Sequence, residues 1–174
     1  EGPIEIAERI EVFRGPNSSV DGSNAVHGVI NIITPVPGAG NNYISIETGP
    51  DDFYRSKVGF STESVRVDFS GSRDDGYKND SGYGQQKLLV KHSGQLQGWE
   101  INSSLFLSNL NQETAGFITG FEAYRVEEQK KENPNPEAYR DAYSLRIMSD
   151  LSKEIRGATI NIQPYLRSVG MKFL

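Results

Sequence analysis

Residues 10–34 read IEVFRGPNSSVDGSNAVHGVINIIT, and this stretch decides the fold of the chain. It contains two short apolar runs, residues 10–13 and 29–33, joined by a connector of Gly, Pro, Asn, Ser and Asp. Short apolar runs bounded by such residues predict strands, and the glycines give the connector backbone conformations that a Cβ would penalise. The stretch therefore predicts a pair of strands in a small packed element.

The rest of the chain, beyond a linker PVPGAG at residues 35–40, alternates apolar and polar residues with period two. Such alternation is typical of strands with one apolar and one polar face. Seven strands are predicted, near residues 42–49, 53–62, 65–70, 85–94, 99–108, 143–151 and 160–167. In the fourth, the run KLLVK does not assign a face. One face of a single antiparallel sheet is predicted to carry Val65, Val67, Phe69, Trp99, Ile101, Leu105, Leu107, Leu145, Ile147, Ile160 and Ile162.

The connections between these strands give a second indication. From the second connection onward, short turns alternate with long loops; the connections are residues 49–52, 62–64, 74–84, 94–98, 110–138 and 152–157. A transmembrane β-barrel has this pattern, because its periplasmic rim carries tight turns and its external rim carries long loops. The apolar face is then expected to meet lipid.

Three segments resemble the end of the plug domain of TonB-dependent outer-membrane receptors, where the plug leads into the first barrel strand. They are AERIEVFRGP at 7–16, GSNA at 22–25 and GVINIIT at 28–34. The chain departs from the family pattern at Val20 and Asp21, where Leu-Tyr is usual, and at His27, where Gly is commoner. The positions that match the plug motif include Glu11, Arg14, Gly15, Pro16, Gly22, Asn24, Gly28 and Asn31.

The resemblance implies an all-β fold of antiparallel transmembrane barrel strands preceded by the C-terminal part of a plug domain. Residues 1–36 are expected to belong to the plug and residues 37–174 to the N-terminal part of the barrel. Since barrels that hold a plug have about 22 strands, the predicted strands, about seven, would form roughly a third of one. The linker is expected to cross to the first wall strand at the periplasmic rim.

The resemblance also implies a place and a function. The parent protein would lie in the outer membrane of a Gram-negative bacterium, in contact with its lipid. It would import a scarce ligand such as a ferric siderophore or cobalamin, and a TonB energy-transducing complex would act on a segment upstream of these residues. Glu11 and Arg14 would form ion pairs between plug and wall; the alternative is a solvated pair at a turn.

Two predicted external loops carry candidate sites. Residues 110–138 contain Phe117, Phe121 and Tyr124, and rings on an external loop need a partner surface. They are candidates for ligand contact, with packing on neighbouring loops as the alternative. The acidic loop 74–84 lacks the EF-hand pattern, so a solvated loop is expected, with calcium binding as the alternative.

Composition limits the remaining function classes. The chain has 174 residues, no cysteine and a net charge of −5, which argues against disulfides and nucleic acid as a partner. Neither His27 nor His92 has a second ligand at metal spacing, so no metal site is predicted. No catalytic constellation or cofactor motif stands out, and an enzyme is not expected. A passive or adhesive outer-membrane barrel and a soluble secreted β-rich binding module remain as alternatives.

Overall fold

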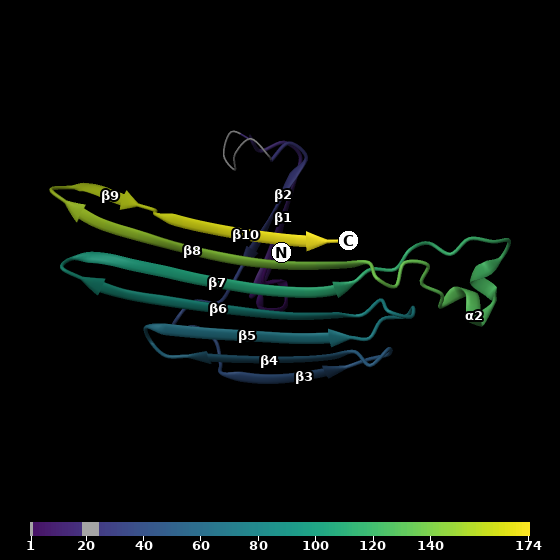
Figure 1. The fold of residues 1–174 in the computed structure, drawn as a ribbon. Coiled ribbons are helices and arrows are strands. Elements are labelled where there is room, and N and C mark those ends of the chain that lie inside the picture. Colours follow the sequence, from purple (N-terminus) through teal and green to yellow (C-terminus); the bar gives the residue numbers. More distant parts are fainter. Residues whose placement is uncertain (1, 19–24) are drawn as a thin grey trace.

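A computed structural model describes residues 2–18 and 25–174 of the chain (Figure 1). Two antiparallel sheets make up the fold: a two-stranded hairpin near the N-terminus and an eight-stranded sheet formed by the remainder. The described helices are too short or too polar to cross a bilayer. The all-β prediction is confirmed.

The N-terminal element begins with the 3-10 turn η1 (Ile4–Ile6) and continues into strands β1 (Arg9–Arg14) and β2 (Gly28–Ile33). In their antiparallel register Arg9 lies opposite Ile33 and Arg14 lies opposite Gly28. These are the two strands that the apolar runs predict. The hairpin crosses behind the large sheet in Figure 1. We refer to residues 2–18 and 25–34 as the plug segment, a label taken from the predicted domain.

The large sheet follows chain order almost throughout, from β3 at one edge to β10 at the other, with β9 beside β8. Its strands are β3 (Tyr43–Thr48), β4 (Tyr54–Ser61), β5 (Val65–Asp74), β6 (Tyr83–Leu96), β7 (Trp99–Glu113), β8 (Tyr139–Ile155), β9 (Ala158–Ile162) and β10 (Tyr165–Phe173). β9 and β10 both pair with β8, so they form one predicted strand with a break at 163–164. Pro164 explains the break, because proline cannot donate a ladder hydrogen bond.

The strand register places all eleven predicted apolar residues on one face. Directly paired residues share a face, and the pairs Phe69–Leu88, Leu88–Leu107 and Leu107–Leu145 run across four strands. We call this the outer face. Its eleven predicted side chains are half-buried or exposed, for example Leu107 at 38% and Ile147 at 43%. Within the described chain these residues do not gather into an enclosed core between two sheets, so the sandwich alternative is not supported.

The opposite face, which we call the lumen face, carries Arg66, Asp68, Lys87, Leu89 and Phe106, all buried. Among the described residues, an apolar cluster on this face joins Leu89 and Phe106 to Ile6 of the plug segment. This explains why KLLVK gives no clear face from sequence. Leu89 points inward with the lysines because it packs against the plug.

The two rims of the sheet differ as predicted. Residues 62–64, 97–98 and 156–157 form tight turns at one rim, and residues 49–53, 75–82 and 114–138 form the loops at the other (Figure 1). β7 extends to Glu113, into the predicted loop 110–138, whereas β8 begins at Tyr139, where that loop is predicted to end and before the predicted strand 143–151. On β7 the outward apolar residues stop at Leu107, so these extensions project beyond the apolar band on the loop side.

Candidate functional site

The plug segment meets the wall through an ion pair between Glu5 and Lys87. The Lys87 Nζ lies 2.7 and 2.8 Å from the two carboxylate oxygens of Glu5. The lysine side chain is 5% exposed and the glutamate side chain 17%. A pair this far from water is screened little by salt, and each charge depends on the other for its compensation.

An apolar contact lies beside this ion pair. Ile6 is 4% exposed and packs with Leu89 of β6 and Phe106 of β7. Complete burial of an isoleucine side chain is worth about 1.5–3 kcal/mol. Charge and apolar surface therefore hold η1 on the lumen face together.

A third contact fixes the end of the hairpin. The Lys91 Nζ donates to the carbonyl oxygen of Thr34 at 2.8 Å. Lys87 and Lys91 lie four residues apart on β6, so one strand contacts both the start and the end of the plug segment.

The linker after the hairpin is bound to a buried cluster on β5. Arg66 donates to both carboxylate oxygens of Asp68, at 2.8 and 2.9 Å, and also to the Ala39 carbonyl at 2.9 Å. The hydroxyl of Tyr43 donates to Asp68 at 3.2 Å. Arg66 is 2% exposed and Asp68 is fully buried. We call Tyr43, Arg66 and Asp68 the linker cluster.

The same linker touches the tight turn after β4. The Gly38 N–H lies 2.7 Å from the Thr62 carbonyl and 3.2 Å from the Ser61 hydroxyl. The Ser61 N–H donates to the side chain of Asn42 at 2.8 Å. The linker therefore reaches the wall at the rim of short turns, as predicted for the periplasmic side.

Glu11, predicted to reach the wall, makes its described contacts inside the hairpin. The Arg9 Nε donates to it at 2.8 Å and the Asn31 amide at 3.2 Å. These two hydrogen bonds, the one from Arg9 being the stronger influence, lower the pKa of Glu11. In this chain Glu11 and Asn31 thus tie β1 to β2, and a contact of Glu11 or Arg14 with the rest of a barrel stays a prediction.

The glycines of the plug motif have separate roles. Gly15 has a φ of +97°, a conformation that glycine adopts readily, and its N–H donates to the His27 carbonyl. A Cβ on Gly28 would lie 2.7 Å from the Phe13 carbonyl oxygen. Only glycine fits there. Pro16 follows on the surface, while Gly22 and Asn24 lie outside the described residues.

The predicted ligand-contact aromatics lie on the long loop and are exposed. Phe117 is 94% exposed, Phe121 is 95% and Tyr124 is 63%. Packing of the two phenylalanine rings on neighbouring loops, the alternative from sequence, does not occur among the described residues. Their rings are free for an external partner.

The backbone of that loop is nevertheless held in place. Lys78 donates to the Gly116 carbonyl at 2.7 Å, and the Asn133 amide donates to the Asp80 carbonyl at 2.8 Å. The Asn79 N–H reaches the Lys131 carbonyl at 2.9 Å. Loop 75–82 is thus hydrogen-bonded to loop 114–138, which carries the exposed rings of Phe117 and Phe121.

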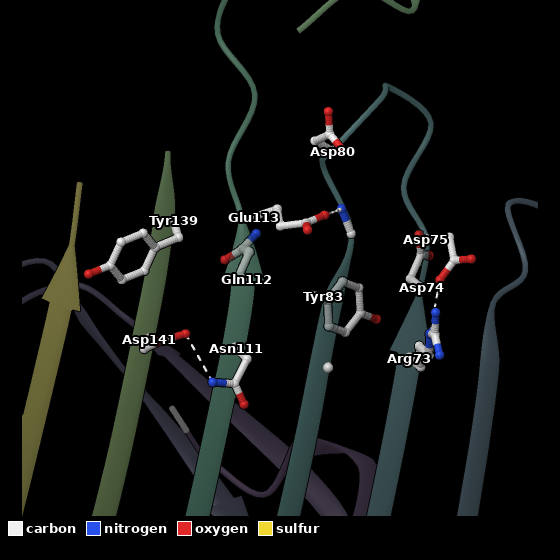
Figure 2. A pocket seen from close by; sticks show the side chains of 12 residues that line it. Arg73, Asp74, Asp75, Asp80, Tyr83, Asn111, Gln112, Glu113, Tyr139 and Asp141 are labelled. Atoms are coloured by element: carbon white, nitrogen blue, oxygen red, sulfur yellow. Dashed lines mark hydrogen bonds and ion pairs between the residues drawn. The ribbon is translucent and has the colours of Figure 1, made fainter. Parts of the chain in front are cut away.

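A depression of about 670 Å³ lies where the strands meet these loops (Figure 2). Asn111 donates to Asp141 there at 3.0 Å, and this pair lies on the outer face in register with the apolar band. Figure 2 shows the plug strands behind the sheet, away from the viewer. The depression therefore opens on the outer side, and within the described chain its carboxylates form no group that could hold a metal ion.

The lumen face carries an arginine pair that the sequence analysis missed. Arg146 lies opposite Phe106 on one side and Arg167 on the other, so all three point into the lumen. The Arg146 guanidinium lies 5.8 Å from the Phe106 ring centre, and its Nε has no hydrogen-bond partner in the described chain. Like charges directly opposite one another are destabilising, so the pair favours an anion beside it.

Sequence signals for the missed residues were weak. Lys87 and Glu5 are 82 positions apart, and KLLVK gives no face by alternation. The arginine pair could have been suggested by alternation on the last two strands, since Arg146 and Arg167 occupy polar positions there, but the register that joins them needs the structure.

Comparison with known proteins gives partial matches. No family profile matches the chain. Over 32 residues it is 62% identical to the iron-regulated outer membrane virulence protein of Vibrio cholerae, a match that covers 18% of this chain and 5% of that protein. Over 97 residues it is 33% identical to the vitamin B12 transporter BtuB of Photobacterium profundum, a match that covers 44% of this chain and 16% of that protein. The chain spans a small part of the length of the curated relatives it matches.

Proposed function

We propose, from the premise that this chain belongs to the TonB-dependent outer-membrane receptors, that the parent protein imports a scarce ligand across the outer membrane with energy from a TonB complex. The observation that carries the proposal is the plug segment seated on the lumen face through Glu5, Ile6 and Thr34. A barrel that passes solutes freely has no need of such an element against its inner wall.

The ligand is proposed to be an iron chelate or a cobalamin. The names of the two relatives point to iron regulation and to vitamin B12, each for that protein. In this chain the pair Arg146 and Arg167 favours an anionic ligand, because the two arginines lie directly opposite each other and the Nε of Arg146 has no hydrogen-bond partner among the described residues. We therefore favour an anionic ferric chelate over uncharged cobalamin.

The exposed rings of Phe117 and Phe121 are proposed to make the first contact with this ligand outside the membrane. Aromatic rings supply contact area with little loss of side-chain freedom. Transport rather than catalysis is proposed for the whole protein.

The test uses the full-length receptor in a Gram-negative indicator strain without its own uptake receptors. The probes are radiolabelled ferric citrate, a neutral ferric tris-hydroxamate and cyanocobalamin. We expect accumulation of ferric citrate that disappears when TonB is deleted. Equal accumulation without TonB would instead support the passive barrel.

Two sets of variants assign the site. R146Q/R167Q is expected to lower ferric citrate uptake at least tenfold, whereas R73Q, which removes an exposed charge on the outer face, should leave it unchanged. F117S/F121S should weaken ferric citrate binding to cells. Binding that survives this change would remove the two rings from the site.

A further inference from the structure

The linker cluster joins the plug to the wall by a buried network. Arg66 and Asp68 are almost without solvent contact, at 2% and 0% exposure, and they form a bidentate ion pair. Two apolar residues of similar size would commonly stabilise a sheet as well as a buried ion pair does. The network therefore calls for a reason other than stability.

That reason is the third contact of the guanidinium. The Arg66 Nη1 donates to the carbonyl oxygen of Ala39, which lies in the linker and not in the sheet. The Asp68 carboxylate binds the guanidinium through Nε and Nη2, and the Tyr43 hydroxyl donates in turn to that carboxylate. Because Nε and Nη2 of Arg66 are held by the two carboxylate oxygens, the planar guanidinium presents Nη1 to the linker in one orientation.

Hydrogen bonds to the wall are unevenly distributed along residues 34–42, which include the linker and its two flanks. Residues 38–42 make four of them, through the N–H of Gly38 (to Thr62 and Ser61), the carbonyl of Ala39 and the side chain of Asn42. Residue 34 makes one, to Lys91. In the described chain residues 35–37 make none to the wall, and Val36 is 50% exposed.

We infer that the linker cluster is the fixed end of the plug tether: residues 38–42 stay on the wall during transport, and the chain becomes free to move upstream of Pro37. Arg66 acts as a positioning residue for the Ala39 carbonyl. The mechanical part of this inference rests on the proposed function, in which the plug is displaced.

The first test needs no ligand. Amide hydrogen exchange of the full-length receptor in detergent is followed as urea rises. Within residues 38–42, the amides of Gly38 and Ala39, which donate to the Thr62 and Val36 carbonyls, should keep the protection of the wall strands at urea concentrations where the amides of β1 and β2 already exchange. Exchange of 38–42 together with the plug would overturn the inference.

Variants of Arg66 sharpen this test. R66A should move residues 38–42 into the early-exchanging group, and R66K should restore part of their protection. The matched control is R73A, because Arg73 and Asp75 form the same i,i+2 pair at one end of β5 but are 75% and 47% exposed. If R66A leaves 38–42 protected, Arg66 is not the anchor.

The second test uses the absence of cysteine from the sequence. A disulfide in G38C/E63C would tie the linker to the turn at its fixed end, where a Cβ on residue 38 would lie 3.9 Å from the Glu63 Cα. A reducible bis-maleimide crosslink between the two cysteines of E5C/K87C would tie the plug itself to the wall, because it spans the length of the glutamate and lysine side chains that it replaces. The single variants, oxidised in parallel, control for strain at Gly38, whose φ is +76°.

Radiolabelled ferric citrate uptake before and after reduction separates the outcomes. We expect the G38C/E63C bridge to leave uptake unchanged and the E5C/K87C bridge to abolish it until reductant is added. Uptake blocked by G38C/E63C would overturn the fixed tether. Uptake that survives the E5C/K87C bridge would contradict plug displacement, and with it the proposed function. The hydrogen-exchange result does not depend on uptake, so it would still decide whether Arg66 anchors the linker.

Discussion

The side chain of Lys87 is 5% exposed, and its ammonium group lies within 2.8 Å of both carboxylate oxygens of Glu5. Lysine loses much favourable hydration at such a site, and this loss offsets the attraction between the two charges. The pair therefore contributes more to positioning the plug than to stability. Its position is the junction of plug and wall. The residue that matters most for seating the plug is therefore a polar residue in the interior of a strand and not a member of the plug motif.

Replacing Lys87 with methionine should loosen the plug. K87M leaves the carboxylate of Glu5 without its partner at a site 17% exposed, and we expect a loss of about 1–3 kcal/mol in plug attachment. The measurement is the urea concentration at which the full-length receptor in a lipid bilayer begins to conduct ions. K153M, which removes an outer-face lysine stacked on Trp99, is the control. An unchanged onset in K87M would refute the role of the pair.

Acid should weaken the hairpin through Glu11. The hydrogen bond from Arg9 lowers the pKa of Glu11 in the folded state, so the unfolded state binds a proton more readily. The stabilisation is present above the ordinary glutamate pKa, about 4.3, and is lost as pH falls through the lower folded value. Hydrogen exchange of β1 and β2 should therefore speed up below about pH 4 beyond its intrinsic pH dependence. E11Q should flatten this change, and a pH response as steep in E11Q would exclude Glu11 as its source.

At the scale of elements, period-two alternation was enough to predict strands and faces, and the lengths of the connections predicted the rims. Alternation failed where a strand meets the plug, because Leu89 has an apolar partner on the lumen side. It also ended β7 too early, since Leu110 is buried on the lumen side beyond the outward apolar band. The plug–wall contacts could not be predicted, because they join residues up to 82 positions apart and depend on how the hairpin crosses the sheet.

The two faces of β7 should respond oppositely to a new charge. Leu105 points outward and Asn102 points to the lumen. An arginine facing the bilayer interior costs about 2–4 kcal/mol, whereas one facing a water-filled lumen costs little. L105R should therefore destabilise the full-length receptor folded in liposomes, lowering its free energy of unfolding by about 2–4 kcal/mol. N102R should change this free energy by less than about 1 kcal/mol. Equal effects would show that the faces are assigned wrongly.

At the scale of the whole molecule, the sheet has two open edges, β3 and β10, and a continuous apolar outer face. Unpaired edges and large apolar surfaces both drive association. The isolated 174-residue chain is therefore expected to form aggregates or need detergent, which sedimentation in plain buffer would report. A sharp two-state melt of a soluble monomer would favour the secreted binding module instead.

The central claim is that the plug segment closes a barrel whose wall begins with these strands. Single-channel recording of the full-length receptor in planar bilayers tests it directly. We predict no steady ion conductance with the plug intact, and a large open conductance once the plug up to Pro37 is deleted. Steady conductance with the plug intact, unchanged by that deletion, would contradict the account.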